Sequence, residues 1–254
     1  MSKTSKVVRL SPIEQQIIEN IRMADKQTLY QELIKLFSSP YLRDSQDFPT
    51  LKQIYFATHE PPTITLDLLI QQGFMTEETA DYLIKCLSLS KNILILGGVG
   101  TGKTTLLQVL LDSVLKSRPD QRTIVLERYS ELKISKVDSG NKPDCQIKNN
   151  LSIEDLSSIN KTPLSNLIIG EITSLDNILS LAFGLKAGSR ILATMHGSDW
   201  KTDIRARIQG NFKDYVEETL INQPFVIVKL SKRNRSIEEV YEDFIERHDE
   251  GAVA

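Results

Sequence analysis

Short aliphatic runs alternate with segments of helical periodicity between residues 92 and 230, and this alternation constrains the fold more than any other feature. Short aliphatic strands that alternate with amphipathic helices indicate a mostly parallel sheet covered on both faces. The sequence therefore predicts an α/β fold. Helices are expected near residues 103–116, 152–160, 174–185, 200–209 and 212–221, and strands at Asn92–Leu96, Arg122–Glu127, Leu167–Gly170, Arg190–Met195 and Pro224–Leu230.

The N-terminal part of the chain has a different pattern. Caps and apolar periodicity predict two helices within the first forty residues, and the four prolines of residues 40–63 indicate a linker or a short irregular strand. A helix capped by Thr65 and another capped by Thr76 follow. We expect a small helical domain with its linker over residues 1–60 and an α/β domain over residues 61–254.

Composition excludes several classes of protein. The 254 residues carry a formal net charge of −2, which argues against a strongly basic nucleic-acid binder. No apolar run has the ~18 residues that a membrane span needs. With only Cys86 and Cys145, a disulfide framework or a zinc site is not expected. The segments FVIVKLSK and SIEEVYEDFI, near the C-terminus, are compatible with an antiparallel edge pair.

The segment ILILGGVGTGKTTLLQVL, residues 93–110, joins a buried strand to a helix through a glycine-rich turn. It satisfies the pattern G-x-x-x-x-G-K-[ST] in the context that the pattern requires. Glycines let several backbone N–H groups point at one small volume, and the helix N-terminus adds partial positive charge there. The predicted phosphate-binding residues are Gly97, Gly98, Val99, Gly100, Thr101, Gly102, Lys103, Thr104 and Thr105.

Two side chains of this turn have specific expected roles. Lys103 brings a full charge to the β- and γ-phosphates, and the Thr104 hydroxyl can ligate a Mg²⁺ ion that bridges them. The alternative is a strand–helix turn without a ligand. The motif favours nucleotide binding, but it distinguishes neither ATP from GTP nor hydrolysis from binding alone.

Three further strand ends carry candidate catalytic groups, because ligands of open α/β sheets bind at the carboxyl ends of the strands. Glu171 ends the segment NLIIGE, Glu127 ends a second strand with Glu131 in the loop after it, and His196 closes a third. Carboxylates could orient water or contact the metal, and a histidine could bond a γ-phosphate. Each also has a simpler interpretation, as a solvated loop charge or a structural histidine.

The order of these motifs resembles the secretion ATPase superfamily, the hexameric motors of type IV secretion, type II secretion and type IV pili. NILILGGVGTGKTTLL is similar to the Walker A segment of that superfamily, IVLERYSEL to its Asp box, LIIGEI to its Walker B segment and ATMHGSD to its His box. The branch resembled is the VirB11/CpaF (TadA) group, over roughly residues 54–245. The resemblance implies a RecA-like P-loop NTPase domain preceded by a small, mainly helical domain.

The resemblance also implies roles for individual residues. Lys103 and Thr104 would hold the phosphates of ATP and the Mg²⁺ ion. Glu171 would be the catalytic carboxylate, with Glu127 and Glu131 in the acidic box near metal and water. His196 would link the γ-phosphate to conformational change.

The partners implied by the resemblance are further copies of the chain and a membrane machine. We expect a homo-oligomer, a hexamer by family resemblance, that acts with membrane-embedded components of a secretion or pilus machine. It would be cytoplasmic, at the inner face of the membrane, without a transmembrane segment and without direct sequence-specific nucleic-acid binding.

Several positions depart from the family pattern. Arg128 stands where an aspartate is usual, and Thr173 stands where an arginine usually follows the Gly-Glu pair. Arg207 lies near the position of a family arginine, with the spacing off by about one residue. Since arginines stabilise charge on the transferred phosphoryl group, their loss could lower the rate ~10³-fold.

Two other functions therefore stay open. The chain could be an ATP-binding assembly subunit with weak or no hydrolysis of its own, or a different P-loop enzyme such as a small-molecule kinase. Near the C-terminus, Lys229, Lys232, Arg233 and Arg235 form a basic cluster. That cluster could contact a membrane surface or an acidic partner, or it could be a solvated edge.

Overall fold

The computed structural model describes most of the chain from residue 64 onward. The chain divides into two units, Met1–Pro62 and Thr63–Ala254, and every described residue belongs to the second. The helices predicted in the first forty residues, the irregular strand of the linker and the helix predicted over 152–160 lie outside the described residues. Those described are 64–127, 131–134, 143–149, 151, 164–208, 212–221 and 223–245.

Within these residues, seven strands form one sheet in the order β3-β2-β4-β5-β1-β6-β7. All neighbouring strands are parallel except β6 and β7, which pair antiparallel at one edge. The strands are β1 (Asn92–Gly97), β2 (Thr123–Leu126), β3 (Cys145–Lys148), β4 (Asn166–Ile172), β5 (Arg190–Met195), β6 (Phe225–Ser231) and β7 (Ser236–Asp243).

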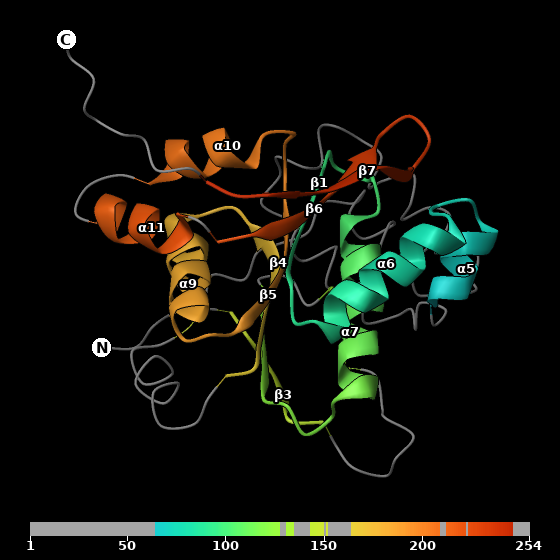
Figure 1. The fold of residues 1–254 in the computed structure, drawn as a ribbon, viewed down its shortest axis with the longest axis horizontal. Coiled ribbons are helices and arrows are strands. Elements are labelled where there is room, and N and C mark those ends of the chain that lie inside the picture. The colour runs from blue at the N-terminus through green and yellow to red at the C-terminus, as the bar shows by residue number, and fades with distance from the viewer. Residues whose placement is uncertain are drawn as a thin grey trace, which may run out of the picture. The chain divides into compact units, whose positions relative to one another are not determined.

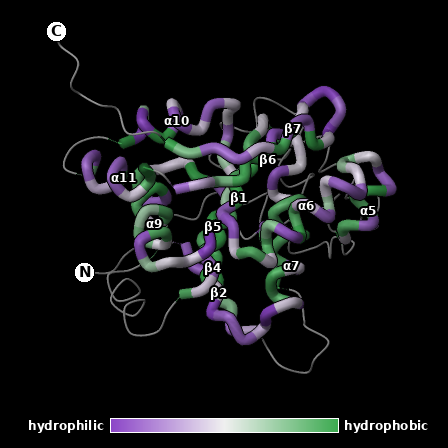
Figure 2. The backbone as a smooth tube through the Cα atoms, viewed as in Figure 1, coloured by the Kyte–Doolittle hydropathy of each residue, from purple (hydrophilic) through white to green (hydrophobic). Residues whose placement is uncertain are grey.

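Helices cover both faces of the sheet (Figure 1). Alternate residues of β1 enter two cores: Ile93 and Ile95 pack with α5, α6 and α7, whereas Leu94 and Leu96 pack in the core that α9, α10 and α11 share. In Figure 2 the apolar segments gather in the middle of the molecule, along the inner strands and parts of the helices that cover them, and many of the connecting turns are hydrophilic. The helices are α5 (Leu66–Gln71), α6 (Glu77–Ser88), α7 (Lys103–Ser117), α9 (Leu175–Lys186), α10 (Trp200–Arg207) and α11 (Lys213–Leu220).

The helix N-termini differ in how their first N–H groups are satisfied. Side-chain oxygens of Thr65, Thr76, Ser174 and Asp199 accept backbone N–H groups at the starts of α5, α6, α9 and α10. By contrast, α7 begins after Gly102, which has no side-chain oxygen and adopts φ 99°. Since the first N–H groups of a helix lack partners within it, this N-terminus suits an external anion.

A buried polar network closes the opposite, amino-terminal end of the sheet. Arg190 donates to Asn166 Oδ1 and, at 2.6 Å, to the carbonyl of Leu87 at the end of α6. Asn166 donates in turn to Thr123 Oγ1 at 2.9 Å. Burial and, to a lesser degree, the nearby charge of Arg118 together lower the pKa of Arg190 to about 10. The guanidinium is therefore charged at neutral pH and is held by neutral acceptors.

The predicted α/β fold class with a mostly parallel sheet is confirmed over the described residues. The five predicted strands and the antiparallel edge pair are present, as are the helices that Thr65 and Thr76 cap. One element differs from expectation. Strand β3, which begins at Cys145 at the other edge of the sheet, was not predicted. Both cysteines are free thiols.

Candidate nucleotide-binding site

The glycine-rich turn joins the central strand β1 to α7 and needs glycine at two positions for steric reasons. A Cβ on Gly97 would lie 2.7 Å from Thr101 Oγ1, and one on Gly102 would lie 2.8 Å from Cε2 of Phe74. Gly100 and Gly102 have φ of 76° and 99°, in the left-handed region that favours glycine. The turn thus has the close backbone packing that its sequence predicts.

Lys103 lies at the first position of α7 and points back over the turn. Its Nζ donates to the carbonyls of Gly97 at 3.0 Å and Gly98 at 2.9 Å. An ammonium has three N–H donors, and among the described residues these carbonyls account for two of them. Burial lowers the pKa of the Lys103 amino group, whereas the charge of Glu171 raises it. An anion at this position would stabilise the charged form further.

The other predicted residues of the turn lie around this lysine. Thr101 is buried and donates to the carbonyl of Gly98 at 2.9 Å. Gly98, Thr104 and Thr105 are half-buried, and Val99 and Gly100 are exposed.

The acidic segment after β2 is in contact with the first turn of α7. Thr104 Oγ1 donates to Glu131 Oε2 at 3.0 Å. Glu127 is buried, and its Oε1 accepts the backbone N–H groups of Glu131 and Leu132. Glu127 therefore holds the loop backbone, and Glu131 faces the hydroxyl that the motif assigns to Mg²⁺.

Gln108, which the motif analysis did not single out, fixes this segment to the helix. Its side-chain amide donates to the carbonyl of Lys133 and accepts from the N–H of the same residue, both at 2.8 Å. Gln108 is one helical turn after Thr104, so the two side chains share a face of α7. The sequence signal available for it was a polar side chain between the apolar residues Leu107 and Val109.

Glu171 lies in a bulge of β4. Ile169 pairs with Ala193 and Ile172 pairs with Met195, so β4 carries one residue more than β5 between these pairs. Bulges re-aim side chains and occur near active sites. Thr194 Oγ1 donates to the carbonyl of Gly170 at 2.6 Å and so fixes the bulge. The Glu171 side chain is exposed, and its charge acts on Lys103.

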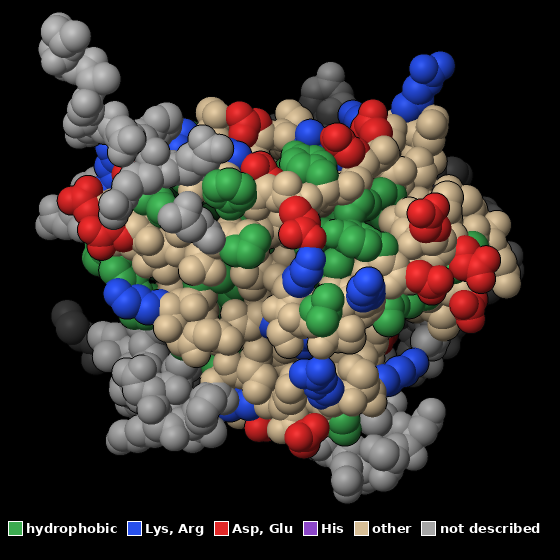
Figure 3. All heavy atoms as spheres, viewed as in Figure 1, with side chains coloured by type: hydrophobic (Ala, Val, Ile, Leu, Met, Phe, Trp, Pro, Cys, Tyr) green, Lys and Arg blue, Asp and Glu red, His purple; other side chains and the backbone are tan. Residues whose placement is uncertain are grey.

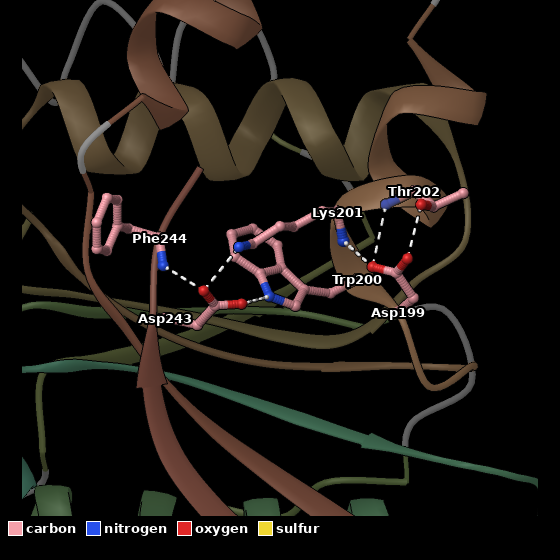
Figure 4. A network of polar contacts seen from close by, with 6 residues as sticks. All are labelled: Asp199, Trp200, Lys201, Thr202, Asp243 and Phe244. Carbon is pink, nitrogen blue, oxygen red and sulfur yellow. Dashed lines mark hydrogen bonds and ion pairs between the residues drawn. The ribbon is translucent and has the colours of Figure 1, made fainter. Parts of the chain in front are cut away.

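His196 is exposed and follows β5 directly. The loop after it is anchored at the start of α10, where Asp199 accepts the N–H groups of Lys201 and Thr202 (Figure 4). Asp243 of β7 then accepts from Trp200 Nε1 at 3.1 Å and from Lys201 Nζ at 2.7 Å. These contacts fix the end of the loop at the start of α10.

The structure brings most of the predicted residues to one edge of the sheet, and Arg207 is the exception. The hydroxyl of Thr104, the residue after Lys103, donates to Glu131. The charge of Glu171 works to raise the pKa of Lys103. Arg207, at the end of α10, bonds within its own helix: its NH1 donates to the carbonyl of Asp203 at 2.7 Å. No described contact connects Arg207 with the turn.

This arrangement fits a nucleoside triphosphate with Mg²⁺. The uncapped start of α7, the glycine packing and the third N–H of Lys103 suit phosphate oxygens. Thr104 and Glu131 offer two oxygens, and Mg²⁺ usually takes one or two protein groups together with phosphates and waters. In the described part of the chain, no cluster of three or more His, Cys, Asp or Glu side chains is placed to bind a metal.

These features define a glycine-rich strand–helix loop in an α/β domain, with the sequence pattern of a phosphate-binding loop. No protein-family model matches the chain. Over 69 residues the chain is 35% identical to the probable conjugal transfer protein TrbB of Sinorhizobium fredii and, equally, to the conjugal transfer protein TrbB of Rhizobium radiobacter. Each match covers 27% of this chain and 21% of the relative. These relatives confirm the resemblance to the secretion ATPase superfamily.

Two solved structures have a related arrangement. The VirB11 ATPase from the Brucella suis type IV secretion system is 18% identical, with a TM-score of 0.49 over 81% of this chain and 65% of that chain. The Legionella pneumophila ATPase DotB is 16% identical, with a TM-score of 0.42 over 65% of this chain and 48% of that chain. Likeness at this level establishes neither activity nor partners. Among the described helices, none combines the length and apolarity of a membrane span.

Proposed function

We propose that the chain is an ATP-hydrolysing motor subunit that energises a type IV secretion, conjugation or type IV pilus machine. The observation that carries the proposal is the loop from β1 to α7, where Lys103 and an uncapped helix start converge on one volume. The similarity to conjugal transfer proteins supports the class of machine. Because the match spans about a fifth of those relatives, we propose the kind of machine together with the activity.

The proposed chemistry assigns a task to each group. Lys103 and the N–H groups at the start of α7 bind the phosphates of ATP, and Mg²⁺ would supply charge neutralisation when bound near Thr104 and Glu131. Glu171 orients a water molecule and accepts its proton as the water oxygen bonds to the γ-phosphorus. The bond from that phosphorus to the β,γ-bridging oxygen breaks, and ADP and phosphate leave.

The proposed coupling uses His196 and the N-terminal part of the chain. His196 would contact the γ-phosphate and respond to its loss, which would change the arrangement of a domain over residues 1–60 relative to one over residues 61–254. Nucleotide can drive such a change only if it favours one arrangement over the other. We propose a ring of six copies, located in the cytoplasm at the inner face of the membrane, in contact with membrane-embedded components.

A second proposal is an ATP-binding assembly subunit with little hydrolysis of its own. The observation in its favour is Thr173, at the position where the resemblance implies an arginine. Its N–H and hydroxyl lie 3.2 and 3.4 Å from Asn177 Oδ1, so this residue completes the start of α9 and brings no cation to the site.

Two substitutions separate these proposals. Lys103→Ala should abolish function by weakening ATP binding, whereas Glu171→Gln should retain binding and lower phosphate release about 10²–10⁴-fold. The measurements are phosphate release and nucleotide affinity, followed by transfer or assembly in cells. If both variants lose function, turnover is required; if only Lys103→Ala does, binding suffices. A wild-type chain without ATPase activity, even with its partners present, would contradict the motor proposal.

A further inference from the structure

The turn between β6 and β7, residues 232–235, lies beside the phosphate-binding loop. In the register of the sheet, Gly97 at the end of β1 pairs with Leu230 of β6. The hairpin closes immediately beyond that pair, where Ser231 pairs with Ser236. The stem of Lys232 therefore reaches the loop: a Cβ built on Gly98 would lie 3.9 Å from Lys232 Cδ.

Contacts with Phe74 hold the hairpin in this position. The N–H of Ile237, just after the turn, donates to the carbonyl of Phe74 at 2.7 Å. The ring of the same Phe74 packs against Gly102, the residue before α7. Because Phe74 contacts both the hairpin and the phosphate-binding loop, it holds the backbone of the hairpin next to that loop.

The cations of the turn differ from the neighbouring Lys229. That lysine bonds Glu239 at 3.2 Å and lies over the ring of Tyr241. Lys232, Arg233 and Arg235 are exposed, and within the described residues no acidic side chain pairs with them. Figure 3 shows a Lys or Arg side chain projecting from the surface near where Figure 1 places this turn. Three like charges within four residues repel one another unless an anion is near.

We propose that the Lys232 ammonium is a second cation for the terminal phosphate of ATP, beside Lys103. The inference rests on the proposed nucleotide-binding function. Lys103 Nζ bonds the carbonyls of Gly97 and Gly98, and Lys232 Cδ lies 3.9 Å from the position that a Cβ on Gly98 would take, so the two lysines approach the turn at one place. Lys232 supplies charge from the chain's own hairpin, at a site where Thr173 supplies none.

The proposal is tested by titrating ATP and ADP, each with Mg²⁺, into the wild-type chain, Lys232→Ala and Arg233→Ala. Lys232→Ala should weaken ATP binding about 5–20-fold, the range of a lost charge-assisted contact, and change ADP binding less than about threefold. Arg233→Ala removes the same charge from the same turn without a described contact to Gly98, so both affinities should change less than about threefold. Lys232→Arg should keep most of the ATP preference, and thermal unfolding confirms that the variants fold.

Each remaining outcome has a definite meaning. If Lys232→Ala binds ATP as tightly as the wild-type chain while Lys103→Ala binds it more weakly, the role of Lys232 is overturned and the proposed nucleotide-binding function still stands. Equal losses in Lys232→Ala and Arg233→Ala, or equal losses for ATP and ADP, would overturn a specific contact with the terminal phosphate. A wild-type chain that binds neither nucleotide would contradict the proposed function itself.

Discussion

Polar side chains at the amino ends of the strands hydrogen-bond to one another. Those at the carboxyl ends surround a loop in which Lys103 keeps an N–H donor that no described residue accepts. At the amino end, Arg190, Asn166 and Thr123 are each at most 4% exposed and form one network. At the carboxyl end, Glu171 and His196 are exposed, and Lys103 bonds only backbone carbonyls among the described residues.

This difference indicates that the amino end of the sheet contributes mainly to stability and the carboxyl end mainly to function. The buried network contributes to stability through the hydrogen bonds of Arg190 and Asn166, although Arg190 Nε has no partner among the described residues. Loss of Arg190 leaves the oxygens of Leu87 and Asn166 without this donor. Groups that keep free donors and solvent access can exchange their contacts for a ligand. We therefore expect substitutions at the amino end to change unfolding and those at the carboxyl end to change nucleotide binding.

The largest effect on stability should come from Arg190→Met. The variant keeps an aliphatic stem, but the buried oxygens of Leu87 and Asn166 lose their donor, so we expect a loss of about 2–3 kcal/mol in the free energy of unfolding. Denaturant unfolding measures this. Arg205→Met, at an exposed position of α10, is the matched control and should change stability by less than ~0.5 kcal/mol. A strong loss of ATP affinity in folded Arg190→Met would break the separation of the two ends.

An intermediate effect should follow from Gln108→Leu. The substitution removes both hydrogen bonds to the backbone of Lys133 and costs about 1–2 kcal/mol of stability. Since it loosens the segment that carries Glu131, the Mg²⁺ concentration needed for half-maximal phosphate release should rise. Ser113→Ala, whose hydroxyl bonds a carbonyl within α7, is the control with no shift in Mg²⁺ requirement. An unchanged Mg²⁺ requirement in Gln108→Leu would show that Glu131 does not depend on this contact.

The smallest effect concerns the end of α6, at the amino end of the sheet. Ser90 has φ 57°, and the N–H groups of Ser90 and Lys91 bond the carbonyls of Leu87 and Cys86. Gly73 and Gly188 occupy the same position after α5 and α9. Ser90→Gly should therefore stabilise the chain by about 0.5–1 kcal/mol, and Gly188→Ser should destabilise it by a similar amount. Thermal unfolding measures both, and a destabilised Ser90→Gly would contradict this helix-end geometry.

Local patterns in the sequence predicted the strands of the sheet interior and the helices with side-chain caps. Continuous aliphatic runs such as that of β1 leave no alternative to a strand buried on both faces. Strand β3 was missed because its four residues, CQIK, are only partly buried and have no apolar periodicity. The close packing of the glycine-rich loop after β1 was predictable because its glycines, lysine and threonines all lie within residues 97–105.

Contacts between distant segments could not be predicted in this way. The bulge that re-aims Glu171 is defined by how β4 pairs with β5, so the sequence of β4 alone does not reveal it. The contact of Gln108 with the acidic segment depends on how a loop folds back onto α7. The position of Lys232 depends on β6 being the neighbour of β1, which follows from sheet order and not from the residues around Lys232.

The central claim is that the loop after β1 binds a triphosphate, and calorimetry of ATP with Mg²⁺ tests it most directly. The wild-type chain should give saturable heat at one site, and Arg190→Met, once folded, should bind equally well. Lys103→Ala should bind about 10–100-fold more weakly, because it loses a charged contact with the phosphates. No heat from the folded wild-type chain, or equal affinity in Lys103→Ala, would contradict the account.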